Sequence, residues 1–424
     1  MKSKILAGVG IAAVAAIALT GCSSSDSADS AGPTTVTVWH GFTEADGDVV
    51  KTIADEFNAS QSDYKVEIEV NPWNVISDKL LPALKAGNGP DLVTQEVVAA
   101  TGYIRQGAFV SLQDFYDNPD NQTDTYDQHV VDYTQVDGEY YGVPMGYAPY
   151  SIWYNKQMWA DAGVTECPTT WDDMLALAEK LTVKGSGGGT PDVYGLSISD
   201  KQIAMLPAFL EAGGGDVYDA DKGVVLDTPE NVKTLEWLRS AYAKGAMPTN
   251  IGLADAVALF TGKKAAMTWI GPWIVSGAEA AGVELGVCNA PAGSERVATP
   301  AAANYWWLTS QGADDEKTKA GSEAFLAYFN SHDSQVTWAV DANYPPNRND
   351  VTAEEMAGNP VIATLTPFVK DAYIRLPGLP GGATDVEAEL DTLSVNISQN
   401  TGGDVSSLVK DTSDKLEGII SEFE

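Results

Sequence analysis

The chain has 424 residues, of which 59 are acidic, 25 are lysine or arginine and three are histidine, for a formal net charge of −34 at pH 7. Proteins bind nucleic acid and anionic lipid through an excess of lysine and arginine, so this balance argues against both partners and against an anionic ligand. It is compatible with a neutral ligand, with a cation, or with a solvated acidic surface that carries no functional message.

The N-terminus is typical of a bacterial export signal, which we predict over residues 1–21. Lys2 and Lys4 precede an apolar run over 5–19 that is too short for a permanent membrane-spanning helix. The run ends in Leu19-Thr20-Gly21-Cys22, which resembles the lipobox of bacterial lipoproteins. The alternative is a plain secretory signal followed by an incidental cysteine.

The lipobox resemblance implies that Cys22 becomes the lipid-bearing first residue of the mature chain. Residues 22–34 are rich in Ser, Asp, Ala and Gly and predict a flexible tether between lipid and protein. We therefore expect an extracytoplasmic protein of a bacterial cell membrane, held by its lipid anchor only.

The first part of the mature chain alternates between strand and helix patterns. We predict strands over 35–39 and 64–70 and from Asp91, and helices over 49–57 and 75–85, the second ended by Gly87-Asn88-Gly89-Pro90. This order indicates an α/β domain with a largely parallel sheet. About 390 mature residues are too many for one core, so two domains are expected.

A second α/β pattern follows an aromatic, β-prone segment over 140–155 that we interpret as an extended crossing. A helix is predicted to begin near Trp171, capped by Thr169 or Thr170. Another is predicted over 229–244, with Thr228 as its cap. The C-terminal region from 384 to 423 predicts two helices broken at Gly402-Gly403.

Cysteine and histidine are too sparse to predict a metal centre or a cofactor. The histidines lie far apart in the sequence, and HExxH and CxxC motifs are absent, so a zinc site is not expected. Cys167 and Cys288 either pair as a disulfide or remain buried thiols, and the sequence leaves that choice open.

Several short motifs occur in an order that resembles the extracellular solute-binding proteins of ABC sugar importers, the maltose-binding-protein-like group. Behind the lipobox these are Val38-Trp-His-Gly-Phe42, Gly87-Asn-Gly-Pro-Asp-Leu-Val93, Tyr140-Tyr-Gly-Val-Pro144, Ile152-Trp-Tyr-Asn-Lys156, Pro168-Thr-Thr-Trp171 and Gly271-Pro-Trp273. Each motif is weak alone, but the series covers essentially the whole mature chain.

The resemblance implies an α/β, two-lobe periplasmic-binding-protein-like fold with a hinge and an interlobe cleft. Lobe 1 would comprise 35–148 plus 286–330, and lobe 2 would comprise 149–285 plus 331–424. It also implies a monomer that captures a carbohydrate, most readily an oligosaccharide, and delivers it to the transmembrane subunits of an ABC import permease. No enzyme activity is expected, and no GxxxxGK[ST] phosphate loop is present, so a separate ATPase would drive transport.

Sugar clefts combine aromatic rings, which cover the apolar faces of the sugar, with polar groups that pair with its hydroxyls. Such residues follow the predicted strands, where α/β sheets bind ligands. The candidate ligand contacts are Trp273, His40, Phe42, Glu44, Trp73, Gln95, Glu96, Tyr147, Trp306, Tyr344 and Arg348. Trp273 is the strongest, because a tryptophan in this Gly-Pro-Trp motif often stacks on sugar in the family.

Two other functions compete with sugar binding. A surface glycoside hydrolase would need two carboxylates flanking the scissile bond, and no acidic residue here lies in a recognisable catalytic motif. The same fold binding a polyamine or another cation through carboxylates and aromatic faces is compatible with the acidic balance.

Overall fold

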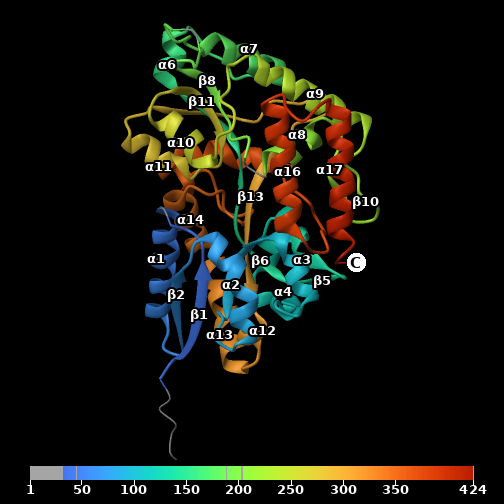
Figure 1. Cartoon of the computed structure of the whole chain (residues 1–424). Coiled ribbons are helices and arrows are strands. Elements are labelled where there is room, and N and C mark those ends of the chain that lie inside the picture. Colours follow the sequence, from blue (N-terminus) through green and yellow to red (C-terminus); the bar gives the residue numbers. More distant parts are fainter. Residues whose placement is uncertain (1–31, 44, 188, 202–203, 424) are drawn as a thin grey trace, which may run out of the picture. The chain divides into compact units, whose positions relative to one another are not determined.

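The structure is a computed structural model that describes residues 32–43, 45–187, 189–201 and 204–423 (Figure 1). The predicted signal over 1–21, Cys22 and Glu44 lie outside these residues, as does most of the predicted tether. Among the described helices, none combines the length and the apolar character that crossing a membrane requires.

The first lobe is built on a six-stranded sheet in the described part of the chain, ordered β14-β13-β3-β1-β2 with β6 also paired to β13. Its strands are β1 (Thr34–His40), β2 (Tyr64–Val70), β3 (Leu92–Glu96), β6 (Gly142–Pro149), β13 (Thr299–Leu308) and β14 (Ala372–Tyr373). β2 and β3 run parallel to β1, whereas β13 runs antiparallel to β3 and β6. The predicted strand–helix–strand–helix–strand order is confirmed.

Helices cover both faces of this sheet. α1 (Ala45–Ser60) and α13 (Glu316–Phe329) pack on β2 and β1, and α2 (Trp73–Lys85) and α3 (Val97–Arg105) pack on β1 and β3. Trp306 consequently packs against Phe325 and Phe329, while Trp307 stacks on Phe109 from the opposite face. Their side chains alternate as expected for a strand, yet both are fully buried.

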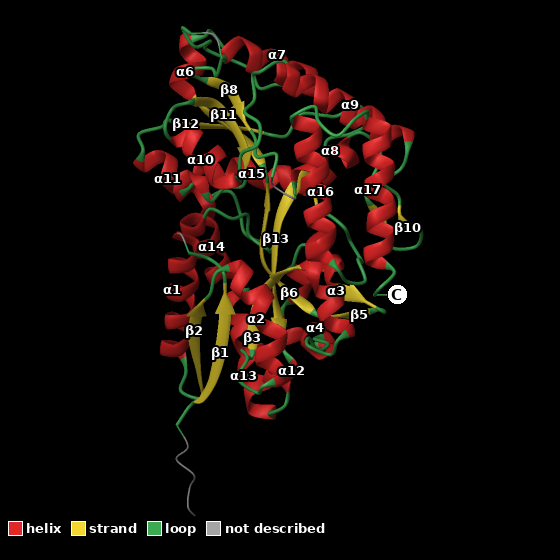
Figure 2. Ribbon diagram, viewed as in Figure 1, coloured by secondary structure: helices red, strands yellow, loops and turns green. Residues whose placement is uncertain are grey.

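The second lobe is built on a four-stranded sheet of the described residues, ordered β12-β7-β11-β8 (Figure 2). Its strands are β7 (Ser151–Asn155), β8 (Tyr194–Ser197), β11 (Ala265–Ile270) and β12 (Leu285–Cys288). β7 runs antiparallel to both β11 and β12. The predicted extended crossing is thus β6 followed by β7, with Tyr150 between the two sheets.

The second lobe's helices begin and end close to the predicted residues. α7 (Trp171–Leu181) has Thr170 as its cap, whose Oγ1 accepts a hydrogen bond from the Asp173 N–H at 3.1 Å. α9 (Pro229–Ala243) is capped by Thr228. α16 (Ala383–Ser398) and α17 (Val405–Ile420) pack against each other and against α9, as Figure 1 shows.

The remaining elements are short or fill gaps around the two sheets. The other α-helices are α4 (Gln113–Asp117), α5 (Gln128–Val131), α6 (Lys156–Asp161), α8 (Met205–Ala212), α10 (Leu253–Thr261), α11 (Ile274–Ala280), α12 (Ser310–Ala313), α14 (His332–Ala342) and α15 (Pro360–Leu365). Short 3₁₀ helices lie at Pro119–Asn121, Thr123–Thr125, Asp132–Thr134, Glu355–Gly358 and Thr366–Asp371. Two small hairpins pair β4 (Gln135–Val136) with β5 (Glu139–Tyr140), and β9 (Tyr218–Asp219) with β10 (Gly223–Val224).

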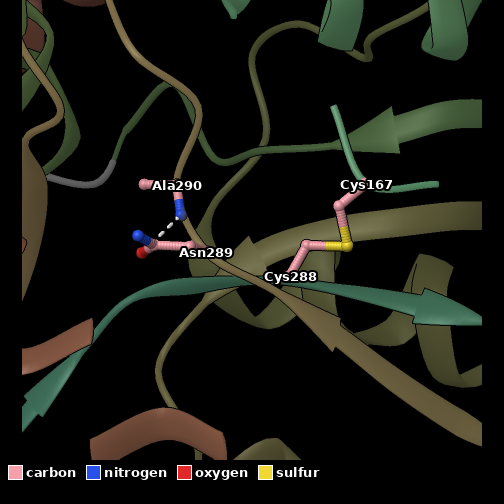
Figure 3. Close-up of a disulfide and its surroundings, with 4 residues drawn as sticks. All are labelled: Cys167, Cys288, Asn289 and Ala290. Carbon is pink, nitrogen blue, oxygen red and sulfur yellow. Dashed lines mark hydrogen bonds between the residues drawn. A yellow bond between two sulfur atoms is a disulfide. The ribbon is translucent and has the colours of Figure 1, made fainter. Parts of the chain in front are cut away.

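Cys167 and Cys288 form a disulfide, with their Cα atoms 5.8 Å apart (Figure 3). The bond links the end of β12 to the loop that precedes α7. It therefore closes a loop of 121 residues within the second lobe.

Strand pairing and helix packing refine the lobe boundaries that the resemblance implied. β12 pairs with β7, so the second sheet continues to Cys288 rather than ending before residue 286. β14 pairs with β13 of the first sheet, and α14 packs on α1. Parts of the predicted 331–424 segment thus lie against the first lobe. The boundaries came from the resemblance alone, since no residue pattern marks the return crossings.

Candidate functional site

A pocket of about 380 Å³ lies where loops of the first sheet meet loops of the second lobe. The first lobe contributes the ends of β1 and β3, the starts of α1 and α2, and part of β13. The second lobe contributes Leu253 and Trp273, and Tyr150 comes from the crossing. The lining residues are Gly41, Phe42, Thr43, Asp46, Trp73, Ser77, Gln95, Glu96, Tyr150, Leu253, Trp273, Ala302, Asn304 and Tyr344. Its volume is within the range of small-molecule sites.

Aromatic rings form the walls of this pocket. Trp73 meets Phe42 edge to face, with ring centroids 5.1 Å apart, and Phe42 meets Tyr344 at 6.4 Å. On the second lobe, Trp273 packs edge to face against Tyr150 at 5.3 Å. Phe42, Tyr150 and Tyr344 are buried, whereas Trp73 and Trp273 remain half-exposed. The two tryptophans are therefore the aromatic surfaces most available to a ligand.

Two glycines allow these tryptophans to lie against the backbone. A Cβ atom on Gly41 would lie 2.2 Å from the Trp73 ring, and one on Gly271 would lie 1.9 Å from the Trp273 ring. Neither position has room for a side chain. Gly41 thereby makes space for Trp73 in the pocket wall.

The polar lining is acidic and amide-rich. Asp46 and Glu96 contribute carboxylates, and Gln95 and Asn304 contribute amides. Gln95 donates from Nε2 to the Ser77 hydroxyl at 3.2 Å, which orients its side chain. Among the described residues that line the pocket, none is lysine or arginine. This surface suits hydroxyl groups or a positive charge, and it repels an anion.

Six of the predicted contacts lie together in this pocket, drawn from both lobes: Phe42, Trp73, Gln95, Glu96, Trp273 and Tyr344. Glu44 lies outside the described residues. The other four, His40, Tyr147, Trp306 and Arg348, do not line the pocket.

Each of these four side chains is buried against other partners. His40 accepts the Phe42 N–H on Nδ1 at 3.2 Å, and burial lowers its pKa to about 4, so the ring is neutral at pH 7. The Tyr147 hydroxyl donates to the Ala372 carbonyl at 3.1 Å. Trp306 is packed beneath α13, and Arg348 pairs with Asp350 at 2.7 Å. These positions do not support their predicted role as ligand contacts.

Several polar or apolar lining residues were not among the predicted contacts: Thr43, Asp46, Ser77, Leu253 and Asn304. Asp46 lies in the first turn of α1 and Ser77 in the second turn of α2, the helices that follow β1 and β2, close to where α/β sheets bind ligands. The predicted contacts that follow β1 and β2 extend only to Glu44 and Trp73, so positions further into these two helices are not among them. No sequence signal marks Leu253 at the start of α10.

Among the described residues, no three histidine, cysteine, aspartate or glutamate side chains lie close enough together to hold a metal ion. The disulfide also removes Cys167 and Cys288 as thiolate ligands.

Residues 52–364 match the family model described as bacterial extracellular solute-binding protein. The chain belongs to this family. The predicted resemblance is confirmed, and the family's description implies a location outside the cytoplasm. The family's description is of proteins that bind solutes.

Individual relatives and solved structures share between about a fifth and a third of their aligned residues with this chain. A maltotriose-binding protein of Pyrococcus abyssi is 24% identical over 80% of this chain and 72% of its own length. A diacetylchitobiose-binding protein of Streptomyces coelicolor is 32% identical over 42% of this chain and 44% of its own. The GacH receptor of Streptomyces glaucescens, solved without ligand and with acarbose, superposes with a TM-score of 0.79 at 21% identity, covering 92% of this chain and all of that one. This last similarity establishes the two-lobe fold.

Proposed function

We propose that the protein captures a neutral oligosaccharide in the interlobe pocket and delivers it to an ABC import permease. The observation that carries the proposal is the placement of two half-exposed tryptophans, Trp73 and Trp273, on opposite lobes of one pocket. Each can cover the apolar face of a sugar ring while carboxylates and amides pair with its hydroxyls. The relatives named for maltotriose and diacetylchitobiose support this class of ligand.

Binding from both lobes couples ligand capture to lobe closure. A ligand that contacts Trp73 and Trp273 together stabilises the closed arrangement over an open one. The permease would recognise that closed form. We further propose that the chain acts as a monomer and catalyses no reaction on its ligand.

The acidic lining favours a neutral saccharide over an anionic one. With Asp46 and Glu96 in the wall, a uronic acid would lie beside carboxylates, and the described lining residues include no lysine or arginine that could pair with it. A polyamine remains the alternative ligand for the same fold, because carboxylates and indole rings also bind cations.

A panel titration tests the proposal. Thermal shift and calorimetry of the purified protein would use malto-, xylo-, manno-, arabino- and galacto-oligosaccharides, a uronate oligomer and spermidine. We expect micromolar binding of a neutral oligosaccharide without hydrolysis, and binding of the matched uronate weaker by about tenfold or more. Binding of spermidine alone would overturn the ligand class, and release of shorter sugars would identify a hydrolase.

The membrane anchor is a separate proposal that depends on Cys22. Cys22→Ser is expected to release the protein from the membrane fraction, because the lipid would be the sole attachment. Cell fractionation with immunoblotting measures this, and Ser23→Ala is the matched control that should stay membrane-bound. A Cys22→Ser protein that still fractionates with membranes would contradict the lipobox assignment.

A further inference from the structure

Glu96 lines the pocket and also forms an ion pair with a residue outside it. Its Oε2 atom accepts a hydrogen bond from Arg375 Nη2 at 2.6 Å. Arg375 lies in the segment between β14 and α16, and its side chain is only 8% exposed, compared with 37% for Glu96. The interaction therefore runs from the pocket wall into the protein interior.

Arg375 is itself held by a second carboxylate. Its Nε donates to Glu387 Oε1 at 2.8 Å, and the Glu387 side chain is 15% exposed. Glu387 lies on α16, which packs on α8 and α9 of the second lobe. Glu96 lies at the end of β3 in the first lobe. One guanidinium thus joins the pocket wall of one lobe to a C-terminal helix of the other.

The group around Arg375 holds more carboxylates than positive charges, because Glu96, Glu387 and Asp391 all lie near this one arginine. Burial raises the pKa of Glu387, against the lowering effect of Arg375. Asp391, one turn further along α16, has its pKa raised to about 6 by burial and by Glu387. Without Arg375, Glu96 would face uncompensated negative charge on α16 and would be pushed from its present position.

We propose that Arg375 is a positioning residue for ligand binding. It fixes the Glu96 side chain through Oε2, and among the described residues no other hydrogen bond to this carboxylate is formed, so Oε1 is left for a ligand hydroxyl. A glutamate held in one conformation does not lose rotamer freedom when the ligand arrives, which strengthens binding. The inference rests on the proposed function, because it assumes that Glu96 touches the ligand.

A double-mutant cycle on affinity tests the link between Arg375 and Glu96. Arg375→Gln and Glu96→Gln are each expected to weaken binding of the panel's best ligand by about tenfold, and the double variant by no more than either single change. Arg375→Lys should recover part of the affinity. Lysine restores the positive charge, but it lacks the planar guanidinium that donates to Glu96 and Glu387 from separate nitrogens. Effects that multiply in the double variant, or wild-type affinity of Arg375→Gln, would overturn the proposal.

Controls separate positioning from general stability. The Arg296 side chain is 55% exposed and pairs with Glu211 at 2.8 Å, so Arg296→Gln removes an arginine–glutamate ion pair away from the pocket lining and should leave affinity unchanged. Circular dichroism and thermal melting verify folding of each variant. If Arg375→Gln does not fold, Glu387→Gln replaces it as the test variant. This change removes one carboxylate that holds Arg375, and it should weaken ligand binding by about threefold. Unchanged affinity of Glu387→Gln would contradict the proposal.

One readout needs no ligand and so distinguishes failure of this inference from failure of the proposed function. In crystals of the ligand-free protein, the Glu96 carboxylate is expected to be ordered beside Arg375, and in Arg375→Gln it should move or lose density. A Glu96 side chain that keeps its position in the variant would refute the positioning role, whatever the panel shows.

Discussion

Replacement of Trp273 by alanine is expected to weaken ligand binding by about 2 kcal/mol or more, which is about 30-fold in Kd. Trp273 is the only tryptophan that the second lobe contributes to the lining of the pocket in the described residues. Its ring is held by Tyr150 and by close approach to Gly271, so it offers a rigid surface for a sugar ring. Calorimetric titration of wild type and variant measures the loss.

A second tryptophan of the same lobe provides the matched control. Trp237 on α9 is also half-exposed, and its Nε1 donates to Asp172 at 2.9 Å, but it does not line the pocket. Trp237→Ala should leave affinity unchanged, and Trp273→Phe should retain part of it. If a folded Trp273→Ala variant binds as tightly as wild type, Trp273 is not a ligand contact.

Loss of the disulfide is expected to cause the largest change in stability. Cys167→Ser with Cys288→Ser opens a loop of 121 residues in the second lobe. Closing a loop of this length restricts the unfolded chain, and removal of such a bond typically lowers the free energy of unfolding by about 2–5 kcal/mol. Denaturant unfolding of both proteins, with and without reductant, measures the difference.

Reductant provides the internal control. It should lower the stability of the wild-type protein to that of the double serine variant and leave the variant itself unchanged. A wild-type protein that unfolds identically with and without reductant, and at the same denaturant concentration as the variant, would contradict a disulfide between these two cysteines.

Local sequence signals predicted the elements of the fold well where neighbouring residues decide the structure. The alternation over 64–70 coincides with β2, and the Thr170 and Thr228 caps begin α7 and α9 as expected. The pairing of Cys167 with Cys288 could not be predicted, because it depends on how β12 returns to the second sheet. The same return places β12 beside β7, a pairing that the boundary implied by the resemblance at residue 286 does not include.

The positions of strand ends predict only part of the candidate site. Residues at or just after strand ends do reach the pocket, such as Gln95 near the end of β3 and Phe42 just after β1. His40 at the end of β1 and Arg348 in the loop after α14 also have polar side chains, yet both are buried by the packing around them. Whether a polar side chain meets a ligand or a buried partner depends on tertiary packing, and no local pattern distinguishes the two outcomes. Trp273 was predicted through a family motif and not through any local pattern.

A crystal structure of the protein with the tightest-binding oligosaccharide of the panel tests the central claim most directly. The account predicts a sugar ring against Trp273 of the second lobe, contact with Trp73 of the first, and hydroxyl groups on Glu96, Gln95 or Asn304. Saccharide density elsewhere on the protein, with the interlobe pocket empty at saturating ligand, would contradict it.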